Sequence, residues 1–591
     1  MKNKPDDKYK VNYIKKTVLK KFFSKNRYIS ATIYVLIVLA AFFSIGISLI
    51  MQKAIDTITS GASFSEFFVV IGISALFLCI VIILNFVNLK LKNLYAKKFS
   101  VYVKNVLFAK LLKKNIVEFE NTDTGEYLSS FQVDMMRLVL NYLTGTWLIV
   151  NSIAVCLIGL ASMFYLSVKL SLILLLLQLV PVIISLILGK KLVEYEKKNV
   201  EKRAEFVSAA QDYLKGFRLV KSFASEKIIF KRFSHFNKKY ETAYKKYNDQ
   251  ESIITVLNEA FNYLMMICLF LFGGLAVING NMTIGSIIAA FEILGTISGP
   301  FSALSVQMNM VRASNALFVR MYDLYFSKSK NEIAEQSAVN NDIKKIKISE
   351  QINIDNVSFS YDNEKYILEN VNCKFEKNKK YAIVGNSGSG KSTLIKLLQG
   401  NYKNFDGKIF FDDYDIKTLN IDVINNAISI VQQDVFIFNA TVWENITLFS
   451  NFEDIRIQNA LEKAGLSEFI STHGLDYYCG ENGKSLSGGE KQRISIARCL
   501  LRDSDVILFD EATAALDNLN STAIENTILS LDKTCIVITH KLNLDLLRKY
   551  DKIFVFDKGT ICESGTADEL MSLKNKFYEL YTAFEHSNNS N

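Results

Sequence analysis

The sequence predicts an α-helical domain with six membrane-spanning helices, followed by a separate α/β domain. Three observations lead to this prediction. Six long runs within the first 305 residues are almost free of charge, short β-type runs alternate with helical ones beyond residue 351, and a polar stretch lies between the two halves. A chain of 591 residues is too long for one ordinary domain, and its three prolines suit long uninterrupted helices.

The chain is therefore expected to contain four segments. They are a basic segment at 1–27, a six-helix transmembrane domain at 28–326, a linker at 327–350 and the α/β domain at 351–591. The six apolar runs lie at 28–52, 67–89, 138–168, 170–189, 260–278 and 283–304, and only the last contains a charged residue, Glu292. About 20 apolar residues cross a bilayer as a helix. A single run could be a buried helix of a soluble protein, but six in succession are typical of a membrane domain. The first run is too long for a signal peptide and has no small-residue cleavage pattern.

The charge of the connections predicts the orientation of the helices. Residues 1–27, 90–137 and 190–250 carry 10, 9 and 16 Lys and Arg, whereas the connections between them carry at most one each. Because basic connections stay in the cytoplasm, both termini, both long loops and the α/β domain are expected there, in a multi-pass protein of the cell membrane. This asymmetry also accounts for the net charge of +10, which therefore does not indicate a nucleic-acid partner. The eight cysteines lack C-x-x-C spacing and indicate neither a zinc site nor a disulfide framework.

The two long cytoplasmic loops are charged and helix-patterned, so we expect them to extend the spans into the cytoplasm. Their turning points are predicted near 124–126 and near 215–217, because each stretch contains a glycine that suits a helix reversal.

A glycine-rich loop in the α/β half fits the pattern G-x-x-x-x-G-K-[ST]. It follows the apolar run 381–384 and precedes Leu-Ile-Lys-Leu-Leu, which opens a helix, and this is the context that the pattern requires. A chance glycine-rich turn is the alternative. The residues predicted to bind phosphates are Gly385, Asn386, Ser387, Gly388, Ser389, Gly390, Lys391, Ser392 and Thr393. Glycines let backbone N–H groups approach the phosphates, the helix N-terminus attracts the anion, Lys391 reaches the outer phosphates, and Ser392 binds Mg²⁺.

A second predicted buried strand begins at Asp505, continues through the apolar residues 506–509 and ends in the two carboxylates Asp510 and Glu511. Asp510 is predicted to hold Mg²⁺, and Glu511 to orient or deprotonate an attacking water. Paired acids at a strand end can instead cap the next helix. His540 follows the apolar run 535–539, and on its own a structural role would be the simpler interpretation.

The stretch Leu-Ser-Gly-Gly-Glu-Lys-Gln-Arg at 486–493 resembles the signature of the ATP-binding-cassette (ABC) proteins. The other motifs follow in the order of that family. Tyr361 resembles the aromatic residue that stacks on adenine. Gln433 resembles the glutamine that joins the nucleotide and metal site to the membrane domain, and His540 resembles the histidine that contacts the γ-phosphate. The resemblance therefore implies that Gln433 and His540 act in catalysis together with Glu511. Residues 515–517 resemble the loop after the catalytic glutamate, and residues 480–483 resemble a motif ahead of the signature of exporters. The cytoplasmic loops resemble those of type I exporters, which are also called type IV.

This resemblance implies an α/β P-loop ABC domain and a half-transporter that must pair. In the family, ATP with Mg²⁺ lies between the phosphate loop of one cassette and the signature of another, which implies contacts from Ser487, Gly488 and Gly489. Glu511, His540 and the signature core are intact, so a homodimer is predicted, and a heterodimer stays possible. The implied function is ATP-driven export of an amphipathic or hydrophobic peptide, drug or lipid. The alternative is a membrane-anchored ATPase that acts as a sensor or regulator.

Glu292 is a carboxylate well inside the sixth predicted span. Ionisable residues at membrane depth usually face a cavity or a partner. On a helix Glu292 shares its face with Gly285, Ala289, Gly295, Thr296 and Gly299, which are small or polar. The stripe can pack against a neighbouring helix, with Glu292 bound by Asn262, Asn85 or Gln178, or it can line a cavity in which Glu292 selects a cationic substrate. The resemblance favours the cavity, because the sixth span lines the pathway of exporters.

Overall fold

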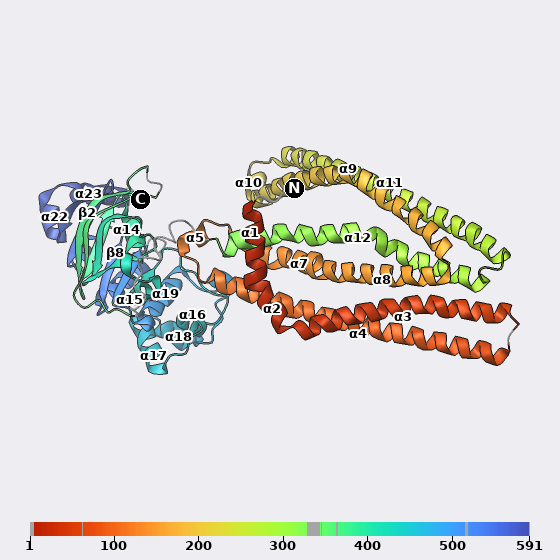
Figure 1. Ribbon diagram of the computed structural model, residues 1–591. Coiled ribbons are helices and arrows are strands. Elements are labelled where there is room, and N and C mark those ends of the chain that lie inside the picture. The colour runs from red at the N-terminus through yellow and green to blue at the C-terminus, as the bar shows by residue number, and fades with distance from the viewer. Residues whose placement is uncertain are drawn as a thin grey trace. The chain divides into compact units, whose positions relative to one another are not determined.

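Long helices account for the regular structure of the first half of the chain, and two β-sheets with surrounding helices account for the second half (Figure 1). The computed structural model describes residues 5–61, 63–327, 343, 345–361, 364–513 and 518–589. The chain divides into a helical unit, Met1–Lys114 with Asn121–Ser327, and a second unit, Asn115–Glu120 with Lys328–Asn591. Most of the expected linker, 327–350, and all of 515–517 lie outside the described residues.

The helical unit is built from long helices joined by short connections. Its helices are α1 (Pro5–Ile14), η1 (Lys15–Leu19), α2 (Lys20–Lys25), α3 (Arg27–Thr59), α4 (Phe64–Leu111), α6 (Thr124–Ser129), η2 (Ser130–Asp134), α7 (Met135–Leu138), η3 (Val139–Thr144), α8 (Gly145–Leu166), α9 (Val168–Lys215), α10 (Phe217–Ser222), α11 (Glu226–Ile278) and α12 (Ile284–Tyr325).

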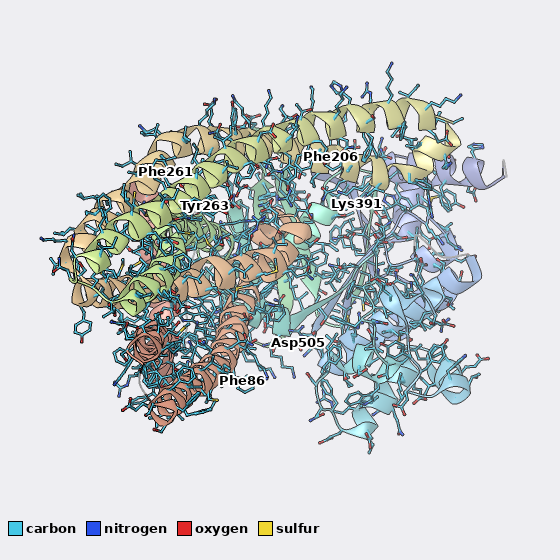
Figure 2. The ribbon with its side chains drawn as sticks, turned by 90° about the vertical axis from the view of Figure 1, so that its right-hand side faces the viewer. Phe86, Phe206, Phe261, Tyr263, Lys391 and Asp505 are labelled. Atoms are coloured by element: carbon cyan, nitrogen blue, oxygen red, sulfur yellow. The ribbon has the colours of Figure 1, made fainter. Side chains whose placement is uncertain are left out.

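Five helical segments of the described chain are long and apolar enough to cross a membrane. They are Arg27–Thr59, Phe64–Leu111, Thr124–Leu166, Glu226–Ile278 and Ile284–Tyr325. The fourth expected span falls in α9, whose apolar stretch is Val168–Val180. Many apolar side chains project outward from these helices, as Phe86 and Tyr263 do (Figure 2), with exposed fractions of 61% and 67%. Such exposure suits helices that face lipid or a partner.

Two apolar clusters hold the helical unit together. One joins the N-terminal helices to α4, α8 and α12 around Phe22, Phe99 and Phe318. The other lies among α3, α8, α9, α11 and α12 around Ile45, Leu269 and Ile293. The helix α1 lies across the long helices (Figure 1) and contacts α12.

The first reversal lies just before the stretch near which it was expected. The chain leaves α4 at Leu111, forms the short helix α5 (Ile116–Glu120) and starts α6 at Thr124, where the Asp123 side chain accepts a hydrogen bond from the Gly125 N–H. Residues 124–126 therefore begin a helix, and the turn lies before them. The helix α5 belongs to the second unit. The second reversal lies where it was expected, with Gly216 between α9 and α10.

The second unit contains a four-stranded sheet in the order β2-β1-β4-β5 and a six-stranded sheet in the order β10-β9-β3-β8-β7-β6. The strands are β1 (Gln351–Phe359), β2 (Leu368–Glu376), β3 (Lys380–Gly385), β4 (Asp406–Phe411), β5 (Tyr414–Asp415), β6 (Ile428–Val431), β7 (Val506–Asp510), β8 (Thr534–Ile538), β9 (Lys552–Asp557) and β10 (Thr560–Gly565).

Helices of the second unit connect these strands and cover the sheets. They are α14 (Lys391–Leu398), η4 (Ile416–Thr418), α15 (Ile421–Ala427), α16 (Val442–Thr447), α17 (Asp454–Lys463), α18 (Ser467–His473), η5 (Glu481–Gly483), α19 (Gly488–Arg502), α20 (Asn518–Ser530), α21 (Leu544–Leu547), α22 (Ala567–Leu573) and α23 (Lys576–Asn589).

The central strands of the larger sheet are parallel and buried, which explains their continuous apolar sequences. β3 pairs in parallel with β8, and β8 pairs in parallel with β7. The carboxyl ends of the three strands therefore meet at one edge of the sheet, which is where ligands bind in open α/β sheets.

Candidate nucleotide site

The edge of the larger sheet brings together residues that are far apart in the sequence. β3 ends at Gly385 and leads into the glycine-rich loop, β7 ends at Asp510 and is followed by Glu511, and His540 follows β8 after one residue. The phosphate loop, the paired carboxylates and the histidine predicted from the sequence thus belong to one site.

The glycine-rich loop has a backbone that requires glycine at two positions. Gly385 has φ +150°, and a Cβ there would overlap the carbonyl oxygen of Phe556. Gly390 has φ +103°, and its Cβ would lie 2.7 Å from a Leu368 methyl. Gly388, with φ +77°, has open space at its Cβ position. The neighbouring residues Asn386 and Ser387 are exposed. The loop can therefore present its backbone to an anion ahead of α14.

Lys391, at the first position of α14 (Figure 2), is buried and donates hydrogen bonds from Nζ to the carbonyl oxygens of Gly385 (2.9 Å) and Asn386 (2.8 Å). Burial lowers the pKa of its ammonium group, and the charges of Glu511 and Asp510 act in the opposite direction. The buried Ser389 hydroxyl has no hydrogen-bond partner in the described chain. A phosphate group would supply the anion and the acceptor that these two side chains fit.

Ser392 and Asp510 place two oxygen atoms together on the other side of this loop. The Ser392 hydroxyl donates to Asp510 Oδ1 at 3.2 Å. Burial raises the pKa of the Asp510 carboxyl, the Ser392 hydrogen bond lowers it, and the charge of Glu511 raises it. A divalent cation would offset the cost of burying this carboxylate, and hydroxyl and carboxylate oxygens are ligands that Mg²⁺ prefers.

Glu511 is held between two side chains from other segments. Gln433 Nε2 donates to Glu511 Oε2 at 3.2 Å, and His540 Nε2 lies 2.9 Å from Glu511 Oε1. Glu511 has φ +52°, a left-handed conformation that is uncommon outside glycine and often marks functional positions. The structure thus brings together the three residues predicted to be catalytic.

Tyr361, predicted to stack on the base, lies at the end of β1 with 47% of its surface exposed. Its ring forms edge contacts with Phe359 and Tyr402, at centroid distances of 5.0 and 5.3 Å. Its hydroxyl lies 3.1 Å from Thr393 Oγ1, which ties it to the helix after the phosphate loop.

The signature segment begins α19. Ser487 is exposed and caps this helix, because its hydroxyl accepts from the Glu490 N–H while the Glu490 carboxylate accepts from the Ser487 N–H. Gly488 is exposed and Gly489 is buried. The hydrogen bonds of Ser487 are formed within its own helix. In the described chain, Ser487 therefore forms no hydrogen bond with the phosphate loop.

Three features of the site were not predicted from the sequence. Gln492 in α19 is buried and donates to the Gln433 carbonyl oxygen at 3.1 Å, which links the signature helix to the Gln433 segment. Tyr402 and α5 also lie beside the site. Gln492 could have been assigned to the site from the sequence, because it belongs to the signature at 486–493. Tyr402 and α5 carry no motif.

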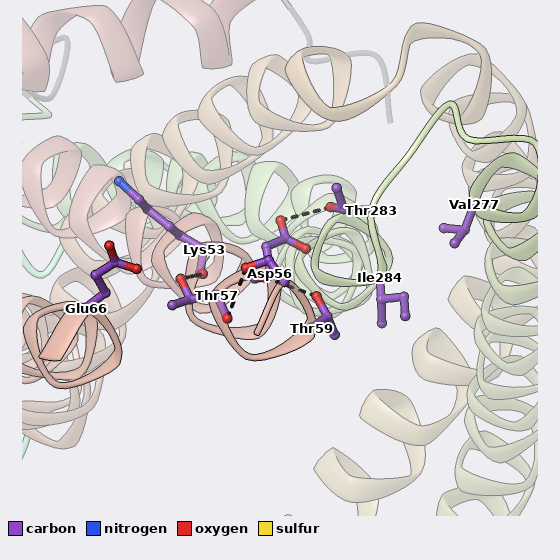
Figure 3. A pocket seen from close by; sticks show the side chains of 9 residues that line it. Lys53, Asp56, Thr57, Thr59, Glu66, Val277, Thr283 and Ile284 are labelled. Carbon is purple, nitrogen blue, oxygen red and sulfur yellow. Dashed lines mark hydrogen bonds between the residues drawn. The ribbon is translucent and has the colours of Figure 1, made fainter. Parts of the chain in front are cut away.

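A second region with functional potential lies in the helical unit. A cavity of about 550 Å³ lies among the ends of α3, α4, α11 and α12 and includes Lys53, Asp56 and Glu66 (Figure 3). The Asp56 carboxylate accepts from the Gly285 N–H at 3.0 Å and from the Thr283 hydroxyl at 2.9 Å, which fastens α3 to the start of α12.

Glu292 does not line this cavity. It is half-buried, and no described side chain, including Asn85, Asn262 and Gln178, forms a hydrogen bond or ion pair with its carboxylate. The proposed stripe divides into two parts. Gly285 and Ala289 are buried, with Gly285 against α3, whereas Gly295 and Gly299 are exposed and have no atom within 4 Å of a Cβ position. The G-x-x-x-G face is therefore not packed against another helix in the described chain, and Thr296 beside it is half-buried.

Comparison with known families identifies both halves of the chain. Residues 31–301 match the ABC transporter transmembrane region, and residues 368–514 match the ABC transporter family. A putative multidrug export ATP-binding/permease protein of Staphylococcus aureus is 30% identical over 91% of this chain and 94% of its own length. An ATP-dependent lipid A-core flippase of Pasteurella multocida is 29% identical over 84% of this chain and 85% of its own length.

Other relatives match over a smaller part. The mitochondrial iron-sulfur clusters transporter ATM1 of Candida glabrata is 34% identical over 63% of this chain, and the chain spans about half of that relative's length, 51%. Among solved structures, a bacterial Atm1-family ABC exporter with ATP bound superposes with a TM-score of 0.79, covering 94% of this chain and 99% of that one at 23% identity. At this identity the likeness shows the fold.

Proposed function

The chain belongs to the ABC exporters that carry a transmembrane region and an ATPase domain together, and from this membership we propose that it hydrolyses ATP to export an amphipathic or hydrophobic substrate. The single observation that carries the proposal is the position of Glu511 between Gln433 and His540, one residue after Asp510. A carboxylate held from two sides beside a phosphate loop suits the activation of water.

Each site residue has a proposed part in hydrolysis. Residues 385–393 bind the phosphates, with Lys391 neutralising their charge. Glu511 positions the attacking water and takes its proton, and His540 holds that carboxylate and contacts the γ-phosphate. Mg²⁺, held by Ser392, Asp510 and the Gln433 amide oxygen, would neutralise charge on the transferred phosphoryl group. Tyr361 stacks on the adenine.

We propose that two copies of the chain pair, with Ser487, Gly488 and Gly489 of one copy completing the site of the other. The exposed N-terminus of α19 supports this arrangement, since an anion would be stabilised there. An exposed aromatic cluster that begins three residues after Gln433 offers a further contact surface for a partner. Phe436, Phe438 and Phe449 are 58%, 41% and 57% exposed, and their rings contact one another at 5.1 and 5.5 Å. Exposed apolar patches of this kind mark interaction sites.

The orientation proposed from the loop charges places both termini and the ATPase domain in the cytoplasm of a cell-membrane protein. Binding of ATP would close the paired cassettes, and hydrolysis would reset them, so that the helices alternate between two states. The relatives comprise transporters named for iron-sulfur clusters, for lipid A-core and for multidrug export, so a peptide, drug or lipid remains the proposed substrate class.

Transport in inside-out vesicles tests this function. ATP-dependent uptake of a fluorescent amphiphile is expected with the wild-type chain and not with Glu511→Gln. ATPase activity in proteoliposomes that responds to the amphiphile without any vectorial uptake would instead favour a membrane-anchored sensor.

A further inference from the structure

Tyr402 connects the base side of the nucleotide site to α5. It follows α14, and its ring contacts both Phe359, at 5.2 Å, and Tyr361, at 5.3 Å with an interplanar angle of 77°. Phe359 is only 1% exposed, so the cluster of three rings is anchored in the core of the smaller sheet. Tyr361 is the most exposed member and presents its surface beyond the cluster.

Tyr402 also lines a cleft of about 250 Å³. Ile116, Val117 and Glu120 of α5 contribute to the walls of this cleft together with Tyr402. The same cleft includes Gln433 and Asp510 of the nucleotide site. Burial raises the pKa of the Tyr402 hydroxyl, and the charges of Tyr361 and Glu120 act in the same direction, so this hydroxyl remains neutral at physiological pH. Tyr402 therefore lines a cleft with α5 and also contacts the base-stacking ring of Tyr361.

When an exposed aromatic ring stacks on a base, it loses rotational freedom, and this loss costs entropy. A ring held at its edges by two other rings has lost that freedom before the ligand binds, which lowers the entropy cost of binding. Tyr361 has this kind of support from Tyr402 and Phe359, and its hydroxyl contact with Thr393 fixes the far end of the ring.

We propose that Tyr402 is a positioning residue that holds the Tyr361 ring for the nucleotide base and links it to α5, so that base binding and the docking of α5 stabilise each other. This inference rests on the proposed ATPase function and on the stacking role of Tyr361. By thermodynamic linkage, the factor by which α5 docking increases the affinity for the base equals the factor by which base binding favours α5 docking.

Comparing ligands with and without a base tests the proposal. In the full-length chain, Tyr402→Leu is expected to raise the KM for ATP about 3- to 10-fold, the loss that one aromatic pair corresponds to. The inhibition constant of inorganic tripolyphosphate, which has no base, should stay within about twofold of wild type on the same reasoning, as should kcat. Tyr402→Phe keeps the ring and should restore the wild-type KM. Tyr366→Leu is the matched control, because this tyrosine is 51% exposed in the same unit and bonds to Asp406 instead.

The link to α5 has its own measurement. Ile116→Ala, which truncates an exposed residue of α5, should raise the KM for ATP in the wild type and have less effect in the Tyr402→Leu background. Additive effects would overturn the link. An equal rise in the KM for ATP and in the tripolyphosphate inhibition constant, or no rise in either, would overturn the positioning role. If Tyr361→Ala itself leaves the KM for ATP unchanged, the proposed stacking fails and the error lies in the proposed site.

Discussion

His540 and Glu511 are in direct contact, with Nε2 of the histidine 2.9 Å from Oε1 of the glutamate. Gln433 bonds to the other oxygen of the same carboxylate. The resemblance of the sequence to ABC proteins assigned separate roles to the histidine and the glutamine, one toward the γ-phosphate and one toward the metal. Their shared contact adds a common role, because two supports fix the direction of the carboxylate that has to orient water.

Glu511→Gln is expected to abolish turnover and to leave ATP binding intact. The substitution removes the base and leaves the phosphate loop unchanged, and the glutamine keeps the shape of the side chain. The loss of a positioned base lowers the rate roughly 10²- to 10⁴-fold. Phosphate release measured at saturating ATP, together with the Kd of a fluorescent ATP analogue, checks both parts.

Lys391→Ala provides the comparison for this variant. It removes the ammonium group from the phosphate loop and should weaken ATP binding itself. ATPase activity of Glu511→Gln within a factor of two of wild type would show that Glu511 is not the base.

Tyr361→Ala is expected to raise the KM for ATP, whereas Tyr361→Phe should be nearly silent. Stacking depends on the ring, which phenylalanine keeps. The hydroxyl contact with Thr393 lies at a partly exposed position, so its loss is expected to change the KM less than about threefold. Steady-state ATPase assays of both variants, which give the KM for ATP, distinguish the role of the ring from the role of the hydroxyl. Equal damage from the two substitutions would assign the main role to the hydroxyl.

Asp510→Asn is expected to stabilise the chain in magnesium-free buffer at neutral pH. Burial raises the pKa of this carboxyl above its usual value, so the charged form is disfavoured in the folded state and lowers stability at neutral pH. As the pH falls through the raised pKa and then through the ordinary aspartate range, the wild-type carboxyl becomes protonated and the difference disappears. Thermal unfolding across pH should therefore show a gain for the variant that shrinks toward acid. ATPase activity should be lost in the variant at every pH. A gain that persists in acid would contradict the assignment to charge burial.

The sequence was sufficient to predict those helices and strands that depend on local patterns of residues. Uncharged runs placed the long helices, and buried apolar runs placed β3, β7 and β8, because parallel strands covered on both faces have no alternation. Tyr402 could not be predicted, since its importance depends on a tertiary contact with Tyr361. The helix α5 was also missed. It has only five residues, and its assignment to the second unit depends on contacts rather than on helical periodicity.

The glycine at 125 shows how a local signal can be assigned the wrong role even where the nearby turn is predicted. A glycine suits a helix end, and the reversal was expected there. The neighbouring Asp123 instead caps the N-terminus of α6, and the Gly125 N–H is the donor. An Asx cap two residues earlier was the competing signal.

Complementation between two inactive chains tests the proposed pairing. Lys391→Ala damages the phosphate loop and Ser487→Arg damages the signature, so each variant alone should lack activity as a homodimer. A mixed dimer would contain one site with an intact phosphate loop from one chain and an intact signature from the other. ATPase activity should therefore reappear on co-expression, at about a quarter of the wild-type level if the chains pair at random and the sites act independently. Purification of the chain expressed alone as an inactive monomer or dimer, or no recovery in the mixture, would count against a homodimer with composite sites.

Glu292→Gln tests whether the exposed end of the α12 stripe serves the substrate. The carboxylate is half-buried and has no side-chain partner in the described chain, while Gly295 and Gly299 on the same face have open space around them. A packing role would require a neighbour at these glycines, and the described chain supplies none, so a face that binds substrate or a second copy is favoured. Transport of tetraphenylphosphonium, a cation, should fall in the variant, whereas transport of a neutral amphiphile, basal ATPase activity and thermal stability should stay near wild type. Thr296→Val, one turn away, keeps the charge and serves as the control. A joint fall of basal activity and thermal stability in Glu292→Gln would identify a packing element, and the binding role would then have to be abandoned.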